Sequence, residues 1–223
     1  MGLADGSYTL GPESGQLLVK TGRTGLGARA GHDLTLEVTR WQAEVTVDSV
    51  DVARSSVRVE ADAGSFEVRS GTGGVKPLTD ADRVEIKKTI REKILHTGQH
   101  PTITFRSAQI TGTPGSFSID GDLTITGRTQ PVTVHARVTD DHVQGTAAIE
   151  QTRWGIRPYT AFLGALKLSD EVTVEFSIRT SPGSCALPRT SKRTTWGCPS
   201  NWGHRQDRLE PGCAAARRLG VLV

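Results

Sequence analysis

The sequence has few of the residues that mark a disulfide-bonded domain, a metal site or a membrane span. Its three cysteines, Cys185, Cys198 and Cys213, all lie near the C-terminus, and their spacing fits no zinc pattern. No run approaches the ~18 apolar residues that a membrane-spanning helix needs. We therefore expect no disulfide framework, no metal and no transmembrane segment.

Catalytic motifs are also missing. The chain has no G-x-S-x-G, no Walker lysine loop and no H-E-x-x-H. His32 with Asp33, and His96 with His100, could form part of an acid–base or metal site if the fold joined them, but each has a simpler role in a loop, at a helix end or before a proline. We therefore expect a protein that is not an enzyme and that has no cofactor.

The N-terminus lacks a secretory signal, because MGLADGSYTLG has neither a basic start nor an apolar stretch. This predicts a cytoplasmic protein. Residues 1–180 carry 20 Lys and Arg against 22 Asp and Glu, whereas residues 181–223 carry 7 against 2. A nearly neutral body offers no basic face, so we expect no nucleic-acid partner.

The C-terminal segment differs from the rest of the chain. Residues 181–223 are rich in Pro, Gly, Ser and Arg and show neither the strand period nor the helix period. Such a segment buries too little apolar area to offset the entropy lost on folding. The sequence therefore predicts a folded domain over residues 1–180 and a disordered basic tail over residues 181–223.

Alternating apolar and polar residues dominate the body of the chain. Within residues 100–134, Ile103 and Phe105 alternate with threonines and Arg106, and glycine and proline mark reversals at residues 112–115 and 127–131. A period of two over so many residues predicts consecutive antiparallel strands with one apolar face. The fold class predicted is therefore all-β.

One helix interrupts this pattern. Thr79 or Asp80 can cap it, and Ile86, Ile90 and Ile94 recur with helical spacing to form one apolar edge. An amphipathic helix beside a barrel can act as a lid over one end or as a structural element that shields the core, and the sequence leaves both interpretations open.

Four segments carry a family resemblance: HPTITFRS at residues 100–107, GDLTITGRTQPVTV at 121–134, IEQTRWGIR at 149–157 and LSDEVTVEFSI at 168–178. In these segments the chain resembles the YceI family, the lipocalin-like polyisoprenoid-binding proteins, and matching segments run from roughly residue 8 to residue 178. The resemblance implies a lipocalin-like eight-stranded antiparallel barrel with a lipid-like ligand inside.

An eight-stranded barrel has an interior that is either just filled by side chains or just large enough for one ligand. The strand residues in the inward phase are mostly small, which favours an open apolar channel, and an empty apolar channel gains dispersion contacts from an apolar guest. We therefore predict that the barrel binds and sequesters a polyisoprenoid, an isoprenoid quinone or a related lipid. The alternative is a stress-related interaction scaffold with a filled core and no ligand, and a homodimer is left open.

The residues predicted to line the ligand are the apolar members of the inward phase and two aromatic residues near a possible entrance. They are Leu34, Leu36, Val45, Val47, Val57, Val59, Phe66, Ile103, Phe105, Phe117, Ile119, Leu123, Ile125, Val132, Val134, Trp154, Phe162, Val174 and Phe176. Trp154 could equally pack one barrel end. If the ligand carries a phosphate, the loop arginines Arg23, Arg29, Arg153 and Arg157 are the available cations.

Overall fold

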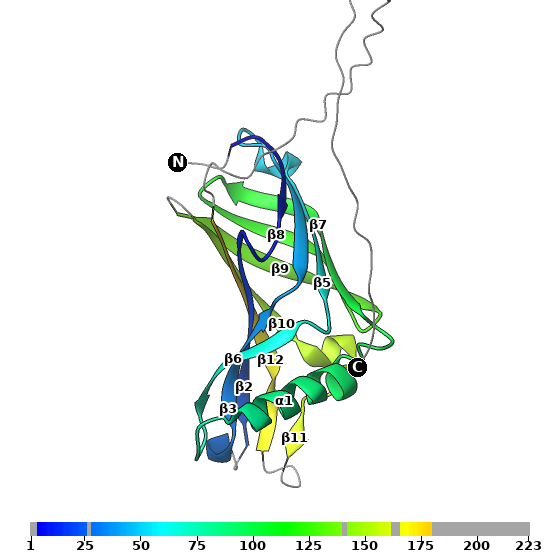
Figure 1. Cartoon of the computed structure of the whole chain (residues 1–223). Helices are drawn as coiled ribbons and strands as arrows, with labels where there is room; N and C mark the ends of the chain where they lie inside the picture. The colour runs from blue at the N-terminus through cyan, green and yellow to red at the C-terminus, as the bar shows by residue number, and fades with distance from the viewer. Residues whose placement is uncertain (1–3, 26–27, 140–141, 162–165, 180–223) are drawn as a thin grey trace, which may run out of the picture. The chain divides into compact units, whose positions relative to one another are not determined.

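The structure is a computed structural model that describes residues 4–25, 28–139, 142–161 and 166–179. The predicted disordered tail, residues 181–223, lies outside the described residues, and so does the side chain of Phe162. The described chain consists largely of β-strands, with an α-helix over Asp80–Thr89 (Figure 1). The predicted all-β antiparallel class with one amphipathic helix is confirmed.

The strands form one antiparallel sheet. They are β1 (Gly6–Leu10), β2 (Gly15–Thr24), β3 (His32–Val38), β4 (Trp41–Val47), β5 (Ser56–Asp62), β6 (Phe66–Gly73), β7 (Thr102–Thr113), β8 (Ser116–Ile125), β9 (Arg128–Val138), β10 (His142–Glu150), β11 (Thr160–Ala161) and β12 (Leu166–Arg179). Their order in the sheet is β1-β4-β5-β7-β8-β9-β10-β12-β2-β3-β6, with β11 added to β12.

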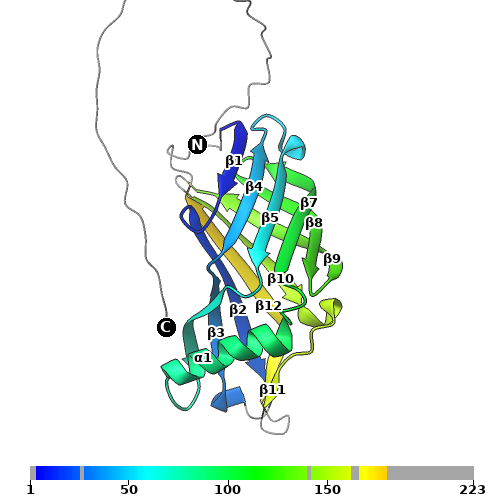
Figure 2. The same ribbon diagram turned by 45° about the vertical axis from the view of Figure 1, so that its right-hand side comes forward.

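Two bends let this sheet curl around an interior. Thr39 and Arg40 separate β3 from β4, and residues 63–65 separate β5 from β6. On one side of the bends β4 pairs with β1 and β5, and on the other side β3 pairs with β2 and β6. A long hairpin therefore changes its neighbours halfway along its length, and the strands wrap into the curled wall seen in Figure 2.

Polar contacts hold the two bends together. The Thr39 amide donates to the Ser65 carbonyl at 3.1 Å, and the Asp62 amide donates to the Arg40 carbonyl at 3.0 Å. Ser65 is buried, and its hydroxyl donates to the Asp62 carbonyl at 2.8 Å. The Arg40 guanidinium donates to the Asp62 carboxylate at 2.8 Å and holds the pKa of that carboxyl below its ordinary value.

The predicted count of eight strands is not confirmed, since the sheet has twelve strands by its hydrogen-bonded ladders. The two bends each divide one extended stretch into two strands, the two-residue β11 adds a third, and the interruption at residues 11–14 adds a fourth, because β1 and β2 pair in succession with the single stretch formed by β4 and β3. An alternating pattern identifies which residues are extended, but it does not show where an extended stretch changes its partners.

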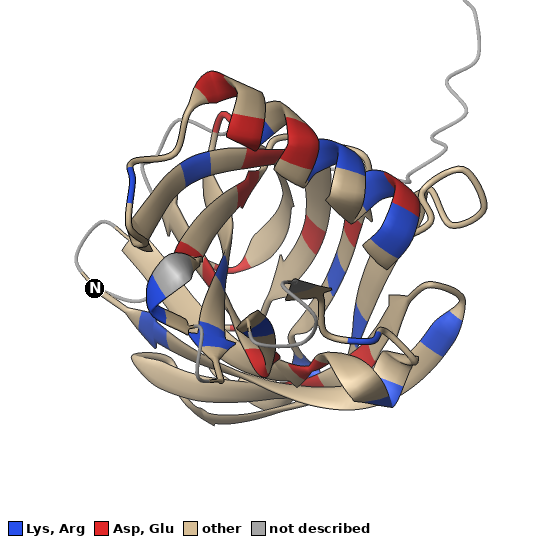
Figure 3. Cartoon of the chain, turned by 90° about the horizontal axis from the view of Figure 1, so that it is seen from below, with Lys and Arg blue, Asp and Glu red and all other residues tan. Residues whose placement is uncertain are grey.

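The helix α1 (Asp80–Thr89) begins at Thr79 and continues into the π-helical turn η3 (Ile90–Ile94). Thr79 and Asp82 form a capping box, in which the Thr79 hydroxyl accepts from the Asp82 amide at 3.2 Å and the Asp82 carboxylate accepts from the Thr79 amide at 2.9 Å. Acidic residues occupy the first turns and basic residues follow, as Figure 3 shows, which suits the helix macrodipole.

This helix covers the edge of β6, the last strand of the sheet. The Arg83 guanidinium donates to the Val68 carbonyl at 2.8 Å, and the Lys87 ammonium pairs with the Glu67 carboxylate at 2.6 Å. Three residues after Lys87 on the same face, Ile90 at the start of η3 is buried in the core. Between the two interpretations left open above, these contacts favour a helix that shields the core.

Candidate ligand-binding interior

The register of the strands places apolar side chains on one face, from one strand to the next. Val59 pairs with Phe105, and Phe105 pairs with Leu123. Further around the sheet, Val174 pairs with both Val19 and Ala147. Residues that pair directly across antiparallel strands lie on the same face. The inner face of the curled sheet is therefore a continuous apolar surface.

Two phenylalanines lie against the wall beside glycines of neighbouring strands. A Cβ atom at Gly121 would lie 2.6 Å from the Phe105 ring, and one at Gly145 would lie 2.5 Å from the Phe176 ring. Each ring thus takes the space that a side chain on the neighbouring strand would fill. The rings of Phe105 in β7 and Phe176 in β12 therefore pack along the inner face of the sheet.

The predicted lining residues divide by exposure into two groups, and Phe162 has no described side chain. The buried group contains Leu34, Leu36, Phe66, Ile119, Val132 and Trp154. The half-buried group contains Val45, Val47, Val57, Val59, Ile103, Phe105, Phe117, Leu123, Ile125, Val134, Val174 and Phe176.

Most of these residues belong to one hydrophobic cluster. The described members of the predicted set that lie outside the cluster are Val47, Val57, Phe105, Phe117 and Ile119. The cluster also contains residues that the predicted set omitted, among them Leu17, Val19, Ala43 and Ile149. The same alternation that selected their neighbours marks these residues, so the sequence already carried the signal for them.

Packing differs between the two ends of the interior. Leu36, Val38 and Phe66, in the half of the sheet that α1 covers, are 5%, 3% and 8% exposed. At the other end, Val45 and Val57 of the paired strands β4 and β5 remain half-buried, as does Phe117 of β8. The interior is therefore densely packed beside the helix, whereas the far end combines these half-buried side chains with buried ones, since Ile110, Ile119 and Ala136 are 4%, 5% and 5% exposed.

Trp154 belongs to the packed end. It lies in the 3-10 turn η4 (Gln151–Trp154), is 1% exposed, and donates through Nε1 to the Leu123 carbonyl at 2.9 Å. The Arg153 guanidinium lies 5.6 Å from the centre of its ring. A side chain this buried and this well hydrogen-bonded fits a structural role at the barrel end, the second of the two roles that the sequence allowed.

The arginines considered for a phosphate lie apart from the accessible apolar surface. Arg23 lies in β2 and not in a loop, because this strand extends to Thr24 by pairing with β12, and it makes an ion pair with Asp33 at 3.5 Å. Arg29 and Arg157 are exposed. The structure therefore brings none of them to the half-buried residues at the far end of the interior.

The polar groups in the core have partners within the protein. No buried side-chain nitrogen or oxygen of the described residues lacks a hydrogen bond. Among the same described residues, no group of three His, Cys, Asp or Glu side chains is placed so that it could hold a metal ion. His32 Nε2 lies 2.8 Å from the Lys76 carbonyl. The interior of the described part is therefore lined by hydrocarbon, and its buried side-chain polar atoms are already hydrogen-bonded.

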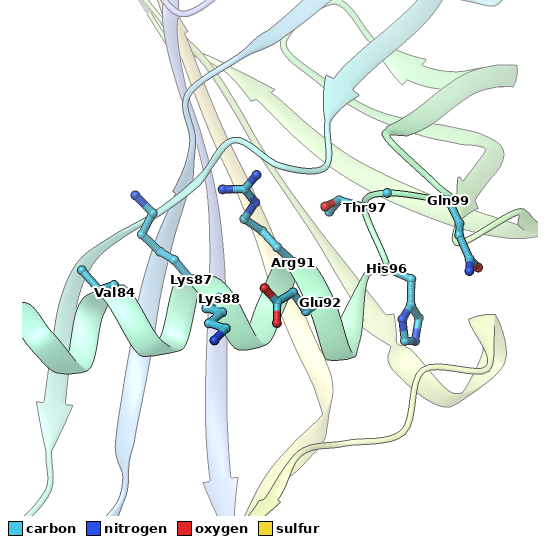
Figure 4. A pocket seen from close by; sticks show the side chains of 9 residues that line it. Val84, Lys87, Lys88, Arg91, Glu92, His96, Thr97 and Gln99 are labelled. Atoms are coloured by element: carbon cyan, nitrogen blue, oxygen red, sulfur yellow. The ribbon is translucent and has the colours of Figure 1, made fainter. Parts of the chain in front are cut away.

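Two hollows open at the surface. One, of about 630 Å³, lies over β8, β9 and β10, and its lining includes Thr133, His135 and Thr146 together with Val132 and Ala147 of the cluster. The other, of about 600 Å³, lies beside α1 and η3 (Figure 4). In the second, Lys87 is paired with Glu67, and Lys88, Arg91 and Glu92 also line the hollow.

No helix in the described ranges is both long enough and apolar enough to cross a bilayer.

A single antiparallel sheet curled around an apolar interior, with a helix along one edge, is the architecture of small all-β proteins that enclose apolar ligands.

The chain belongs to the YceI-like domain family, whose pattern matches residues 8–180. BcnA from Burkholderia cenocepacia is similar in structure, with a TM-score of 0.54, 19% identity, and coverage of 73% of this chain and 95% of that chain. The YceI protein of Campylobacter jejuni gives a TM-score of 0.50, 11% identity, and coverage of 65% and 82%. A polyisoprenoid binding domain from Saccharophagus degradans gives a TM-score of 0.48 and 8% identity, with coverage of 79% of this chain and 98% of that chain. None of the curated proteins compared matches the chain.

Proposed function

We propose that this protein binds a long apolar molecule of the polyisoprenoid class inside the curled sheet. The observation that carries the proposal is a group of inward-facing apolar side chains, at the end of the interior away from α1, that are not fully buried. Val45, Val57 and Phe117 are apolar and belong to the inward phase, yet they stay half-buried. Apolar side chains that contact water are stabilised when an apolar ligand replaces that water.

The expected strength of binding follows from the buried hydrocarbon. Burial contributes about 0.8 kcal/mol per CH2 group, so a chain that buries about ten such groups gains about 8 kcal/mol. An association cost of about 4 kcal/mol leaves about 4 kcal/mol, which is a Kd near ~1 mM. A chain that buries about fifteen CH2 groups keeps about 8 kcal/mol after the same cost, which is a Kd near ~1 μM, so a long isoprenoid can bind without any hydrogen bond.

The chemistry of the wall supports an apolar ligand over a polar one. All buried polar side-chain atoms of the described chain already have partners, so a ligand that offered a hydroxyl or a carboxylate would find no complementary group in the core. The proposed mechanism is sequestration, in which the ligand is shielded from water and no bond is made or broken. We also propose that binding resides in residues 1–180.

The test is extraction of lipid from the full chain purified from its own host, together with native mass spectrometry of the same material. We expect an adduct with the mass of a long isoprenoid, which organic solvent removes. Protein that carries no lipid, and that takes up none from an added long-chain polyprenol, would favour the alternative, an interaction scaffold with a filled core.

A further inference from the structure

One rim of the curled sheet is formed by β11 and by the ends of β12, β2, β3 and β6, which neighbour one another in that order. Across this rim Thr160 pairs with Lys167, and Lys167 pairs with Thr24. Further along, His32 pairs with Gly73. Neighbouring strands are about 4.8 Å apart, so the rim extends over roughly 19 Å along the sheet from β11 to β6. Figure 3 views the molecule from this end.

The strand ends and loops of this rim carry an excess of positive charge. We call them the basic rim, and they comprise residues 24–25, 28–33, 73–78, 157–161 and 166–167. The basic rim has four exposed cations against one carboxylate, that of Asp33. The cations are Arg29, Lys76, Arg157 and Lys167.

The charge of the basic rim is not neutralised within the described chain. Asp33 is already paired with Arg23 at 3.5 Å. None of the four exposed cations makes an ion pair with a carboxylate of the described residues. The helix that lies nearby adds little, because α1 and η3 together carry five cations and four carboxylates. The basic rim therefore presents a net positive charge to its surroundings.

Two large apolar side chains are exposed on the same rim. Val75 is 78% exposed and Tyr159 is 41% exposed. Both lie on segments that polar contacts hold in place. His32 Nε2 lies 2.8 Å from the carbonyl of Lys76, the residue after Val75. The Leu168 amide donates to the Tyr159 carbonyl at 3.0 Å. The fold thus holds these two side chains in solvent, among the cations of the basic rim.

The opposite end of the molecule has an exposed apolar residue in the reverse electrostatic setting. Val50 lies in the turn that follows β4, at the end that carries β1 (Figure 2), and is 92% exposed. Asp48 and Asp51 lie on either side of it, and Arg54 pairs with Asp48 at 3.3 Å. Exposed apolar side chains therefore lie among cations at one end of the molecule and beside carboxylates at the other.

The chemistry of the basic rim fits the surface of an anionic lipid bilayer. Anionic lipids attract nearby Lys and Arg, and Tyr is enriched at the level of the lipid head groups. A stable protein interface requires a continuous apolar centre from which charged residues are depleted. Here Lys76 directly follows Val75, and Arg157 lies two residues before Tyr159. This mixture of separate apolar and basic groups is suited to a bilayer surface.

We propose that the basic rim docks this protein on the surface of an anionic lipid bilayer. In this arrangement Val75 and Tyr159 enter the head-group region, and the four cations lie against lipid phosphates. This inference goes beyond the proposed function and does not depend on it, because docking requires no ligand in the interior.

Sedimentation with lipid vesicles tests the docking. The full chain is mixed with vesicles of phosphatidylcholine that contain about 30% phosphatidylglycerol, or with vesicles of phosphatidylcholine alone. Val75→Asp is compared with Val50→Asp, which makes the same change at an exposed valine away from the basic rim. The basic C-terminal segment is present in every variant, so a difference between the two reports on the basic rim.

A second pair of variants tests the charge. Lys76→Glu with Arg157→Glu reverses two cations of the basic rim. Arg106→Glu with Arg137→Glu makes the same change in net charge at exposed positions of β7 and β9. The Tm of each variant is measured on the same preparation, and it should stay near that of the wild type because the altered side chains are exposed.

We expect the wild type to sediment with the anionic vesicles at least about tenfold more tightly than with the neutral ones. Each cation near an anionic surface contributes roughly fivefold to affinity, so Lys76→Glu with Arg157→Glu should weaken binding about thirtyfold or more. Its control should weaken binding less than about threefold. Val75→Asp should weaken binding at least about fivefold, and Val50→Asp less than about twofold.

A fluorescent probe reports which end meets the bilayer. In the full chain with its three cysteines replaced by serine, the fluorophore NBD is attached to Val75→Cys or to Val50→Cys. The anionic vesicles should raise the emission at position 75 at least about twofold and leave the emission at position 50 unchanged.

Three outcomes would overturn docking through the basic rim. They are a wild type that does not prefer the anionic vesicles, rim variants that bind as tightly as their controls, and equal responses of the two probes. None of them bears on the proposed function, since lipid extraction and polyprenol uptake are measured without vesicles.

Discussion

Replacement of Phe117 by tryptophan distinguishes an interior that is open to a ligand from an interior that side chains fill. Phe117 is half-buried in β8, pairs with Ala136 of β9, and lies outside the hydrophobic cluster. In an open interior the larger ring occupies ligand space. If it displaces about three CH2 groups of the ligand, binding weakens by about 2.4 kcal/mol, which is about fiftyfold in Kd.

The same substitution should have little effect on stability. A larger side chain inserted into a well-packed core costs about 1–3 kcal/mol, which for a domain of this size lowers Tm by roughly 2–4 °C per kcal/mol. At a position that is not fully packed, we expect a cost under about 1 kcal/mol. The prediction for Phe117→Trp is therefore lost binding with a nearly unchanged Tm.

The assay is retention of a radiolabelled polyprenol on gel filtration, with Tm measured on the same preparations. Ser116→Trp is the matched control, because Ser116 is exposed on the same strand. It should leave both the retained polyprenol and the Tm unchanged. A Phe117→Trp protein that keeps its ligand but loses several degrees of Tm would show that this part of the interior is solid.

Three further predictions concern stability. Thr79→Ala removes the helix cap and should cost about 1 kcal/mol of unfolding free energy, measured by urea denaturation. Asp62 has a lowered pKa in the folded protein because Arg40 binds its ionised form, so this stabilisation is present at neutral pH and is lost as the pH falls through the folded pKa. Arg40→Gln should therefore make the urea midpoint fall less between pH 7 and pH 3 than it does in the wild type. An equal fall of the midpoint in the two proteins would contradict this. Trp154→Phe leaves the Leu123 carbonyl without its buried donor and should cost about 1–3 kcal/mol, again measured with urea.

Local patterns in the sequence predicted the strands, the helix and most of the inner face. Alternation is a local property, and it was enough to select Val59, Leu123 and Val174, which the structure places in one hydrophobic cluster. The capping box at Thr79 is equally local, because it depends on a residue three positions away.

Features that depend on distant partners were not predictable in this way. Residues 21–24 continue β2 because Lys167 and Leu168 of β12 pair with Thr24 and Arg23, although the sequence predicted that Arg23 lies in a loop. The bend at Thr39 and Arg40, where β3 passes into β4, likewise depends on the neighbouring strands on each side. The different packing of the two ends of the interior depends on the position of α1, which no pattern of alternation records.

The contact between Arg83 and the carbonyl of Val68 has a consequence for solubility. An uncovered strand edge can pair with the edge of another molecule and so begin aggregation. The helix occupies this edge of β6 in the folded protein, and its attachment depends in part on the cap at Thr79. Weakening of the cap should therefore promote intermolecular strand pairing at temperatures where the rest of the sheet is still folded, so that turbidity would rise before the loss of ellipticity.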